Sequence, residues 1–125
     1  MPLLGSLVAY LPTPRGHEGE VVIDPLERLV DEAVTAGASG VAVLGSTGGY
    51  PYLTAAERRL VVEAAVAAAD GRVPVVAGVG AFTTDEVIVH TIVAERAGAA
   101  AVLLPTLAYL PLTDDEVLDL VTEVA

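Results

Sequence analysis

The stretch VAVLGSTGGYPYLTAAE, residues 41–57, contains the end of an apolar run, a glycine-rich loop and the start of a helix. The glycines surround two adjacent hydroxyl residues, Ser46 and Thr47. At Thr54 a capping box begins, in which the threonine oxygen accepts from the N–H of Glu57 and the glutamate carboxylate accepts from the N–H of Thr54. The stretch therefore predicts a buried strand, a loop and a helix, in that order.

The same helix-start pattern recurs along the chain at nearly equal intervals. A capping residue is followed three positions later by glutamate in DPLE at 24–27, TAAE at 54–57, TTDE at 83–86 and TDDE at 113–116. In the first of these, Pro25 suits the first helical position, where its missing N–H costs no hydrogen bond. The starts are 30, 29 and 30 residues apart, and this spacing is typical of a unit made of one strand and one helix.

Short apolar runs between these helix starts predict four strands. They cover residues 3–11, 40–44, 73–78 and 100–104. The runs are continuous rather than alternating, which is typical of parallel strands covered on both faces. Gly37, Gly71 and Gly98 follow the helical segments, where a left-handed residue commonly ends a helix. The expected fold is therefore α/β, with four βα units equal to the first half of a (β/α)8 TIM barrel.

Half a barrel cannot cover all of its own strands. Four parallel strands in barrel curvature would leave two open edges and one uncovered face. The final segment, LVTEVA, lies inside the fourth predicted helix and carries no capping signal. We expect residues 1–125 to be the N-terminal half of a barrel domain whose C-terminal half lies outside the chain. A pair of half-barrels, or a small open sheet of the flavodoxin type, is the alternative.

Composition and charge exclude several classes of function. A net charge of −11 argues against binding to nucleic acid, which needs a basic surface. The chain has no cysteine, and His17 and His90 are far apart, so we expect neither a disulfide nor a metal site. The start MPLLGSLVAYLPTP lacks a basic region and favours a first strand over a signal peptide. We expect a cytoplasmic protein with no membrane partner.

The loops that follow the strands are the expected ligand-binding region, because folds of this kind bind ligands at the carboxyl ends of their strands. GSTGG, after the second strand, offers two hydroxyls, consecutive N–H donors and glycines that allow close approach. A site for a small carboxylate or phosphate and a hydrogen-bonded turn are both open interpretations. The motif GVG at 78–80 lacks the third glycine and the acid of a dinucleotide site, so it predicts a tight turn. We expect no cofactor.

Five motifs occur in order along the chain: GSTGG, LTAAER, GRVPVVAGVG, TTDEVI and AGAAAVLLP. Together they resemble the N-terminal half of the dihydrodipicolinate synthase/N-acetylneuraminate lyase family. The opening GSLVAYLPTP is similar to the first strand of that family. The resemblance implies a (β/α)8 barrel, usually tetrameric, that acts on pyruvate or a related 2-keto acid through a Schiff base.

The resemblance also implies roles for three side chains. Ser46 and Thr47 match a hydroxyl pair that binds the pyruvate carboxylate, and Ser46 would join a proton relay, which Schiff-base chemistry needs near neutral pH. Tyr109 matches a tyrosine that in many members reaches the active site of a neighbouring subunit, which implies a homo-oligomer, dimeric or tetrameric. The chain departs from the family at Gly49, where glutamate is usual, and at PTLAYLP, which replaces a proline followed by two aromatic residues.

The chain contains no lysine, and its six Lys or Arg residues are all arginines. A Schiff base requires an amine, and the guanidinium of arginine does not replace it. In the family, this amine belongs to a lysine on strand six, assisted by a tyrosine on strand five. We expect the intact protein to be a lyase or aldolase that makes or breaks carbon–carbon bonds, or dehydrates a keto acid, and these residues alone to be inactive. The alternative is a non-catalytic half-barrel that dimerises or binds a small carboxylate.

Overall fold

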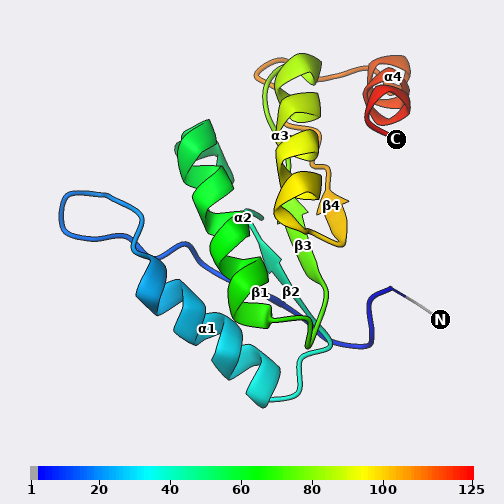
Figure 1. Cartoon of the computed structure of the whole chain (residues 1–125). Helices are drawn as coiled ribbons and strands as arrows, with labels where there is room; N and C mark the ends of the chain where they lie inside the picture. The colour runs from blue at the N-terminus through cyan, green and yellow to red at the C-terminus, as the bar shows by residue number, and fades with distance from the viewer. Residues whose placement is uncertain (1–2) are drawn as a thin grey trace.

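The computed structural model describes residues 3–125, which form four successive βα units (Figure 1). The elements are β1 (Val8–Tyr10), α1 (Ile23–Thr35), β2 (Gly40–Val43), η1 (Tyr50–Tyr52), α2 (Ala55–Ala69), β3 (Val75–Gly78), α3 (Thr84–Ala97), β4 (Ala101–Leu103) and α4 (Asp114–Val124). This order confirms the predicted alternation of strands and helices. Within residues 3–125, no helix has the length and apolar character that a membrane crossing requires.

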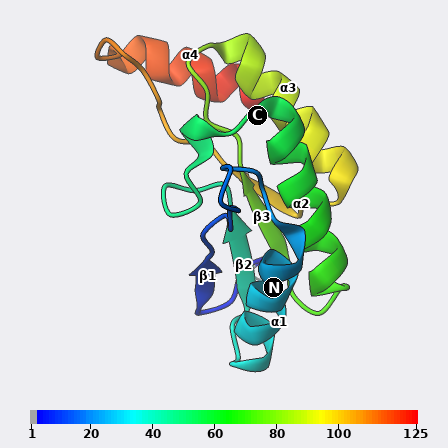
Figure 2. The same ribbon diagram turned by 90° about the vertical axis from the view of Figure 1, so that its left-hand side faces the viewer.

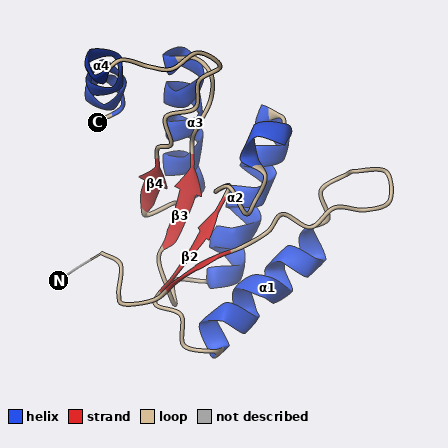
Figure 3. Cartoon of the chain, turned by 180° about the vertical axis from the view of Figure 1, so that it is seen from behind, coloured by secondary structure: helices blue, strands red, loops and turns tan. Residues whose placement is uncertain are grey.

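The four strands form one parallel sheet in the order β1-β2-β3-β4. Each strand therefore lies beside the strand that precedes it in the chain, and the helix between them returns the chain to the same end of the sheet. Figure 2 shows α1, α2 and α3 on one side of the sheet, and Figure 3 shows the same layers from behind. α4 packs against α3 (Figure 1). Sequential parallel strands with helices on one side form half of a (β/α)8 barrel.

The hydrophobic core lies between the sheet and the helices α1, α2 and α3. The central strands contribute Val41, Val43, Val75 and Ala77. The helices contribute the fully buried side chains Leu26, Val30, Val61 and Val87. Burial of one valine or leucine side chain stabilises a fold by roughly 1.5–3 kcal/mol. This layer therefore fixes the two central strands, and with them the loops at their carboxyl ends.

The outer strands are less buried than the central ones. Every residue of β2 and β3 is buried, whereas the residues of β1 and β4 are half-buried or exposed. Tyr10 of β1 lies beside Ala42 in the sheet register and leaves 52% of its surface exposed. This partial exposure of β1 and β4 agrees with the prediction that half a barrel leaves two open edges and one uncovered face. Each outer strand has a strand neighbour on one side only.

The predicted capping boxes form completely at two helices. At α2 and α4, the side chains of Thr54 and Thr113 accept from the backbone of the glutamate three residues later, and that glutamate accepts from the threonine N–H. At α3 the box is half formed, because Thr83 accepts from the N–H of Glu86 at 3.2 Å without the return bond. Local sequence therefore fixes where these three helices begin.

The predicted capping box at Asp24 is wrong, because α1 begins at Ile23 and its N-cap is Val22. Val22 is extended, and its N–H donates to the carbonyl of Pro14 at 3.0 Å. The helix therefore starts directly after the residue that this hydrogen bond fixes. Asp24 lies in the first turn, where its charge suits the positive end of the helix dipole. Pro25 is the third helical residue, where an N–H would still lack an intrahelical partner.

The predicted glycine signals mark the ends of α1 and α3. Gly37, just past α1, has a φ of 100°, and Gly98 caps α3 with a φ of 101°. α2 differs, because its C-cap is Asp70 with a φ of 48°, one residue before Gly71. Aspartate tolerates this left-handed conformation better than most residues. Gly71 follows with a φ of 73°, one residue past the C-cap as Gly37 is at α1, so the glycine signal is confirmed at the end of α2 as well.

Candidate functional site

The loop between β2 and α2 turns through its backbone. Leu44, directly after β2, has a positive φ of 61°. The N–H of Gly49 donates to the carbonyl of Ser46 at 3.1 Å, and Gly49 has a φ of 65°, which glycine adopts without steric cost. The turn therefore closes before η1 begins, and it does so without using a side chain of the loop itself.

Ser46 and Thr47 lie side by side in this turn, and both side chains are exposed. The bonds that hold the turn come from its backbone and from Thr13, so within residues 3–125 neither loop hydroxyl is needed to close it. Two adjacent hydroxyls can each donate a hydrogen bond to a carboxylate or a phosphate. The two interpretations of GSTGG are thus compatible, because the backbone makes the turn and the side chains remain available.

Side chains from β1 and β4 border the start of this loop. A Cβ atom placed on Gly45 would lie 3.4 Å from Cδ1 of Tyr10 and 3.8 Å from Cδ2 of Leu103. No sequence motif marks Tyr10 as a site residue. The signal that identifies it is the strand register, which pairs Tyr10 with Ala42 and so directs it to the same end of the sheet as Gly45. A half-exposed tyrosine therefore stands next to the loop that carries the hydroxyl pair.

Tyr109 lies in the loop between β4 and α4 and leaves 92% of its surface exposed. A side chain this exposed makes almost no contact with its own chain, so the structure does not bring Tyr109 against Ser46 or Thr47. The same loop is anchored at its beginning, where Cγ of Pro105 lies 2.5 Å from the position of a Cβ on Gly80. Of the three predicted site residues, the structure brings two together.

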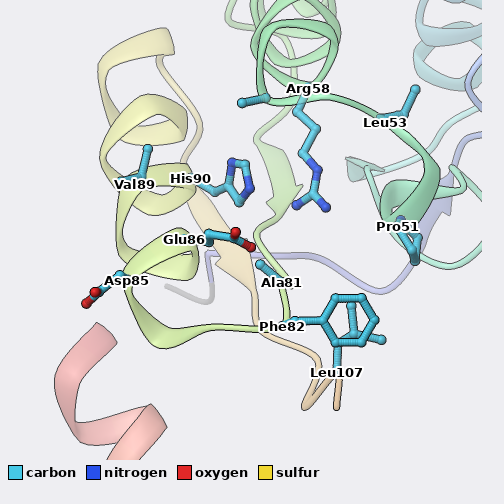
Figure 4. A pocket seen from close by; sticks show the side chains of 11 residues that line it. Pro51, Leu53, Arg58, Ala81, Phe82, Asp85, Glu86, Val89, His90 and Leu107 are labelled. Carbon is cyan, nitrogen blue, oxygen red and sulfur yellow. The ribbon is translucent and has the colours of Figure 1, made fainter. Parts of the chain in front are cut away.

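A separate cavity of about 420 Å³ lies between α2, α3 and the β4–α4 loop (Figure 4). Its charged or titratable lining residues are Arg58, Asp85, Glu86 and His90, and its apolar lining includes Phe82 and Leu107. In Figure 4 the side chains of Arg58, Glu86 and His90 point toward one another. The predicted site residues do not line this cavity.

Arg58 is the charged residue buried most deeply in the described chain, with 7% of its surface exposed. Its Nη1 donates to the carbonyl of Gly80 at 2.6 Å, and its guanidinium lies 5.5 Å from the ring centroid of Tyr50. Burial lowers the pKa of Arg58, while Tyr50 and Glu86 raise it, and an arginine stays protonated at neutral pH. The contact to Gly80 joins α2 to the β3–α3 loop and the contact to Tyr50 joins α2 to η1, and both offset part of the cost of burying this charge.

His90 of α3 is half-buried beside Arg58. Burial lowers the pKa of His90, the positive charge of Arg58 lowers it further, and Glu86 opposes the shift. His90 is therefore neutral at pH 7. His17 lies far from it, in the β1–α1 loop. Among residues 3–125, no group of three or more histidine, cysteine, aspartate or glutamate side chains is placed to hold a metal ion.

The model of the Dihydrodipicolinate synthetase family matches residues 3–125. The chain belongs to the dihydrodipicolinate synthetase family. This membership confirms the resemblance carried by the GSTGG, TTDEVI and neighbouring motifs. Together with the four parallel βα units, it confirms the expected α/β fold of half a TIM barrel.

Two curated members of the family are more than 40% identical to this chain over the residues that align. The 4-hydroxy-tetrahydrodipicolinate synthase of Nitrosospira multiformis is 44% identical over 99 residues, which cover 79% of this chain. The enzyme of the same name from Cereibacter sphaeroides is 45% identical over 105 residues, which cover 84% of this chain. These relatives are lyases. The chain spans about a third of their length, 33% and 36% respectively.

Solved structures of the family superpose closely on this chain. Dihydrodipicolinate synthase from Agrobacterium tumefaciens has a TM-score of 0.90 at 41% identity, over 94% of this chain and 40% of its own. The chloride-inhibited enzyme from Acinetobacter baumannii, solved with pyruvate, has a TM-score of 0.91 at 32% identity, over 98% of this chain and 42% of its own. A prophage protein of the family from E. coli K12, also in complex with pyruvate, has a TM-score of 0.94 at 27% identity, over 99% and 42%.

Proposed function

We propose that this chain supplies the N-terminal half of a (β/α)8 lyase domain that acts on pyruvate or a related 2-keto acid through a Schiff base. The observation that carries the proposal is the exposed hydroxyl pair, Ser46 and Thr47, at the carboxyl end of a buried central strand. Two solved relatives that contain pyruvate support the choice of substrate class. In this proposal residues 1–125 correspond to β1α1 to β4α4 of the domain.

Ser46 and Thr47 would bind the substrate through its carboxylate. Each hydroxyl donates one hydrogen bond to a carboxylate oxygen, and such charge-assisted bonds are stronger than neutral ones. Ser46 would also accept and return a proton while the imine forms and breaks, since an oxygen that both donates and accepts can serve in a relay. The glycines around the pair allow the carboxylate to reach the backbone as well.

Tyr109 would complete this relay in a neighbouring subunit of a homo-oligomer, a dimer or a tetramer. Its 92% exposure supports this role, because a phenol so free of its own chain is available to another copy. The proposal includes a cytoplasmic location. A chain without cysteine draws no stability from an oxidising compartment, which is compatible with the cytoplasm.

The amine of the Schiff base would come from residues beyond these 125. The chain has no lysine, so no side chain of it can form an imine with a keto acid. By itself it would therefore bind a 2-keto acid without catalysing its cleavage or condensation. The alternative is a non-catalytic half-barrel that dimerises or binds small carboxylates, which the half-exposed outer strands β1 and β4 favour.

Reductive trapping tests the proposal that this chain does not supply the amine of the Schiff base. The chain is treated with ¹⁴C-pyruvate and sodium borohydride, after acetylation of its N-terminal amine, and the label on the protein is counted. We expect no label above a control without borohydride. Covalent label on any residue of the acetylated chain would contradict the proposal that the amine lies elsewhere. Sedimentation of the chain as a stable monomer would exclude the dimeric alternative.

A further inference from the structure

A hydrogen bond from the β1–α1 loop reaches the loop that carries the hydroxyl pair. The side-chain oxygen of Thr13 donates to the carbonyl of Gly48 at 2.8 Å, in a half-buried position. Gly48 directly follows Thr47 and belongs to the turn closed by Ser46 and Gly49. This bond therefore holds the peptide next to the two hydroxyls from outside the turn.

The sequence around Thr13 reduces the conformational entropy that is lost when this hydrogen bond forms. Thr13 stands between Pro12 and Pro14. A proline fixes its own φ, and it also restricts the residue before it to extended conformations. The backbone of Thr13 thus has few states to lose on folding. Because threonine is also β-branched, its χ1 is restricted, and the hydroxyl is directed with little further ordering.

The other side of the Gly48 peptide is fixed by packing. A Cβ on Gly48 would lie 2.9 Å from the nitrogen of Leu44 and 3.3 Å from the carbonyl oxygen of Leu11. The glycine is therefore packed between Leu11, directly after β1, and Leu44, directly after β2. Thr13 and this packing restrain the same peptide from different directions.

The strained residue Leu44 is part of the same restraint. It is 2% exposed with a φ of 61°, a conformation that costs a non-glycine residue of the order of 1 kcal/mol or more. A Cβ on Gly78 of β3 would lie 1.8 Å from the carbonyl oxygen of Leu44, so the turn needs a glycine there. Such a backbone persists only where its surroundings determine it. The loop is therefore shaped by β1, β3 and Thr13 together.

We propose that Thr13 is a positioning residue for the hydroxyl pair. Its hydroxyl holds the Gly48 carbonyl and so keeps Ser46 and Thr47 in the geometry that receives a substrate carboxylate, a role that rests on the proposed function. A preformed loop loses less conformational freedom when the ligand binds, and this raises its affinity. Thr13 touches no substrate in this account and acts through the loop alone.

The test uses three variants of the whole chain and two readouts. T13V removes the hydroxyl and keeps the shape, T13S keeps the hydroxyl, and T91V is the matched control. Thr91 also donates its hydroxyl to a backbone carbonyl at 2.8 Å in a half-buried position, but within α3. The readouts are the dissociation constant for pyruvate, from ¹H–¹⁵N spectra, and the hydrogen-exchange rates of the loop amides without ligand.

We expect T13V to weaken pyruvate binding about 3- to 10-fold, the range of one net hydrogen bond, and to speed exchange at Ser46, Thr47 and Gly48. T13S should remain within about twofold of the wild type, and T91V should change neither readout even where it lowers the melting temperature as much as T13V. Wild-type behaviour in T13V, failure of T13S to restore binding, or an equal effect of T91V would overturn the inference. A wild-type chain that binds no pyruvate would refute the proposed function, and the exchange rates would still decide the role of Thr13.

Discussion

The two loops that carry the predicted site residues differ in how firmly the chain holds them. The β2–α2 loop follows a fully buried strand, is closed by the bond between Gly49 and Ser46, and is tethered by Thr13. The β4–α4 loop follows a half-buried outer strand and leaves Tyr109 92% exposed. The chain therefore holds the loop of the proposed carboxylate site by its own contacts. The proposed role of Tyr109 would require contacts with another copy of the chain.

The largest expected effect comes from filling the space beside Gly78 that the β2–α2 loop needs. Gly78→Ala places a methyl group against the carbonyl of Leu44, and we expect a loss of about 3 kcal/mol in the free energy of unfolding, or no folding at all. The matched change Gly45→Ala meets neighbours at 3.4 and 3.8 Å, which are ordinary contacts, and should shift stability by less than about 1 kcal/mol. Urea unfolding measures both. Equal effects would mean that the turn at Leu44 is not constrained by β3.

A second test compares a valine of β2 with a valine of β4, the strands that precede the two loops. Val41 of β2 is fully buried, so Val41→Ala should cost about 2 kcal/mol through lost burial and the cavity left behind. Val102 of β4 is 36% exposed, and Val102→Ala should cost less than about 1 kcal/mol. Equal losses in urea unfolding would show that β4 is covered in solution, for example by a second copy of the chain.

The helices that follow the two loops start with the same capping box and differ in burial. Thr54→Ala should lower global stability by about 1 kcal/mol, because α2 contains several buried residues. Thr113→Ala removes an equivalent cap from α4, which contains no fully buried residue within the described chain. We expect this second variant to speed hydrogen exchange within α4 while leaving the urea midpoint almost unchanged. A shared fall in the midpoint would show that α4 unfolds together with the core.

The smallest expected effect concerns the cavity between α2, α3 and the β4–α4 loop. Burial and Arg58 lower the pKa of His90 in the folded chain, so below its ordinary pKa of about 6.5 the unfolded state binds the proton more readily. His90 therefore reduces stability as the pH falls through that value, and it has no such effect above it. His90→Gln should flatten the change in melting temperature between pH 8 and pH 5.5. An unchanged pH profile would show that His90 is solvated.

Sequence patterns were most reliable where structure is decided locally. The capping residues Thr54, Thr83 and Thr113 marked three helix starts, because the bonds involved span three residues. The start of α1 was not predicted correctly, because the hydrogen bond from the Val22 N–H to the Pro14 carbonyl sets it. The partial coverage of the outer strands followed from the predicted half-barrel topology and not from local composition, since coverage depends on what lies beside and above a strand.

The site was predicted in the same uneven way. Ser46 and Thr47 were proposed because glycines and hydroxyls stand together in the sequence, and their exposure is what the structure adds. The neighbouring Tyr10 and the tether from Thr13 were missed, because they depend on strand register and on a contact across 35 positions. Tyr109 is located by family likeness and not by any contact within the chain. Its position in a completed site therefore remains a prediction.

The central claim is that this chain alone presents a carboxylate site at Ser46 and Thr47. The most direct measurement is a pyruvate titration of the ¹⁵N-labelled chain, followed residue by residue in ¹H–¹⁵N spectra. Our account predicts saturable shifts centred on the amides of residues 45–49, and their loss in the double variant Ser46→Ala, Thr47→Val. Saturable shifts confined to the cavity beside Arg58, or none at all in a folded chain, would contradict it.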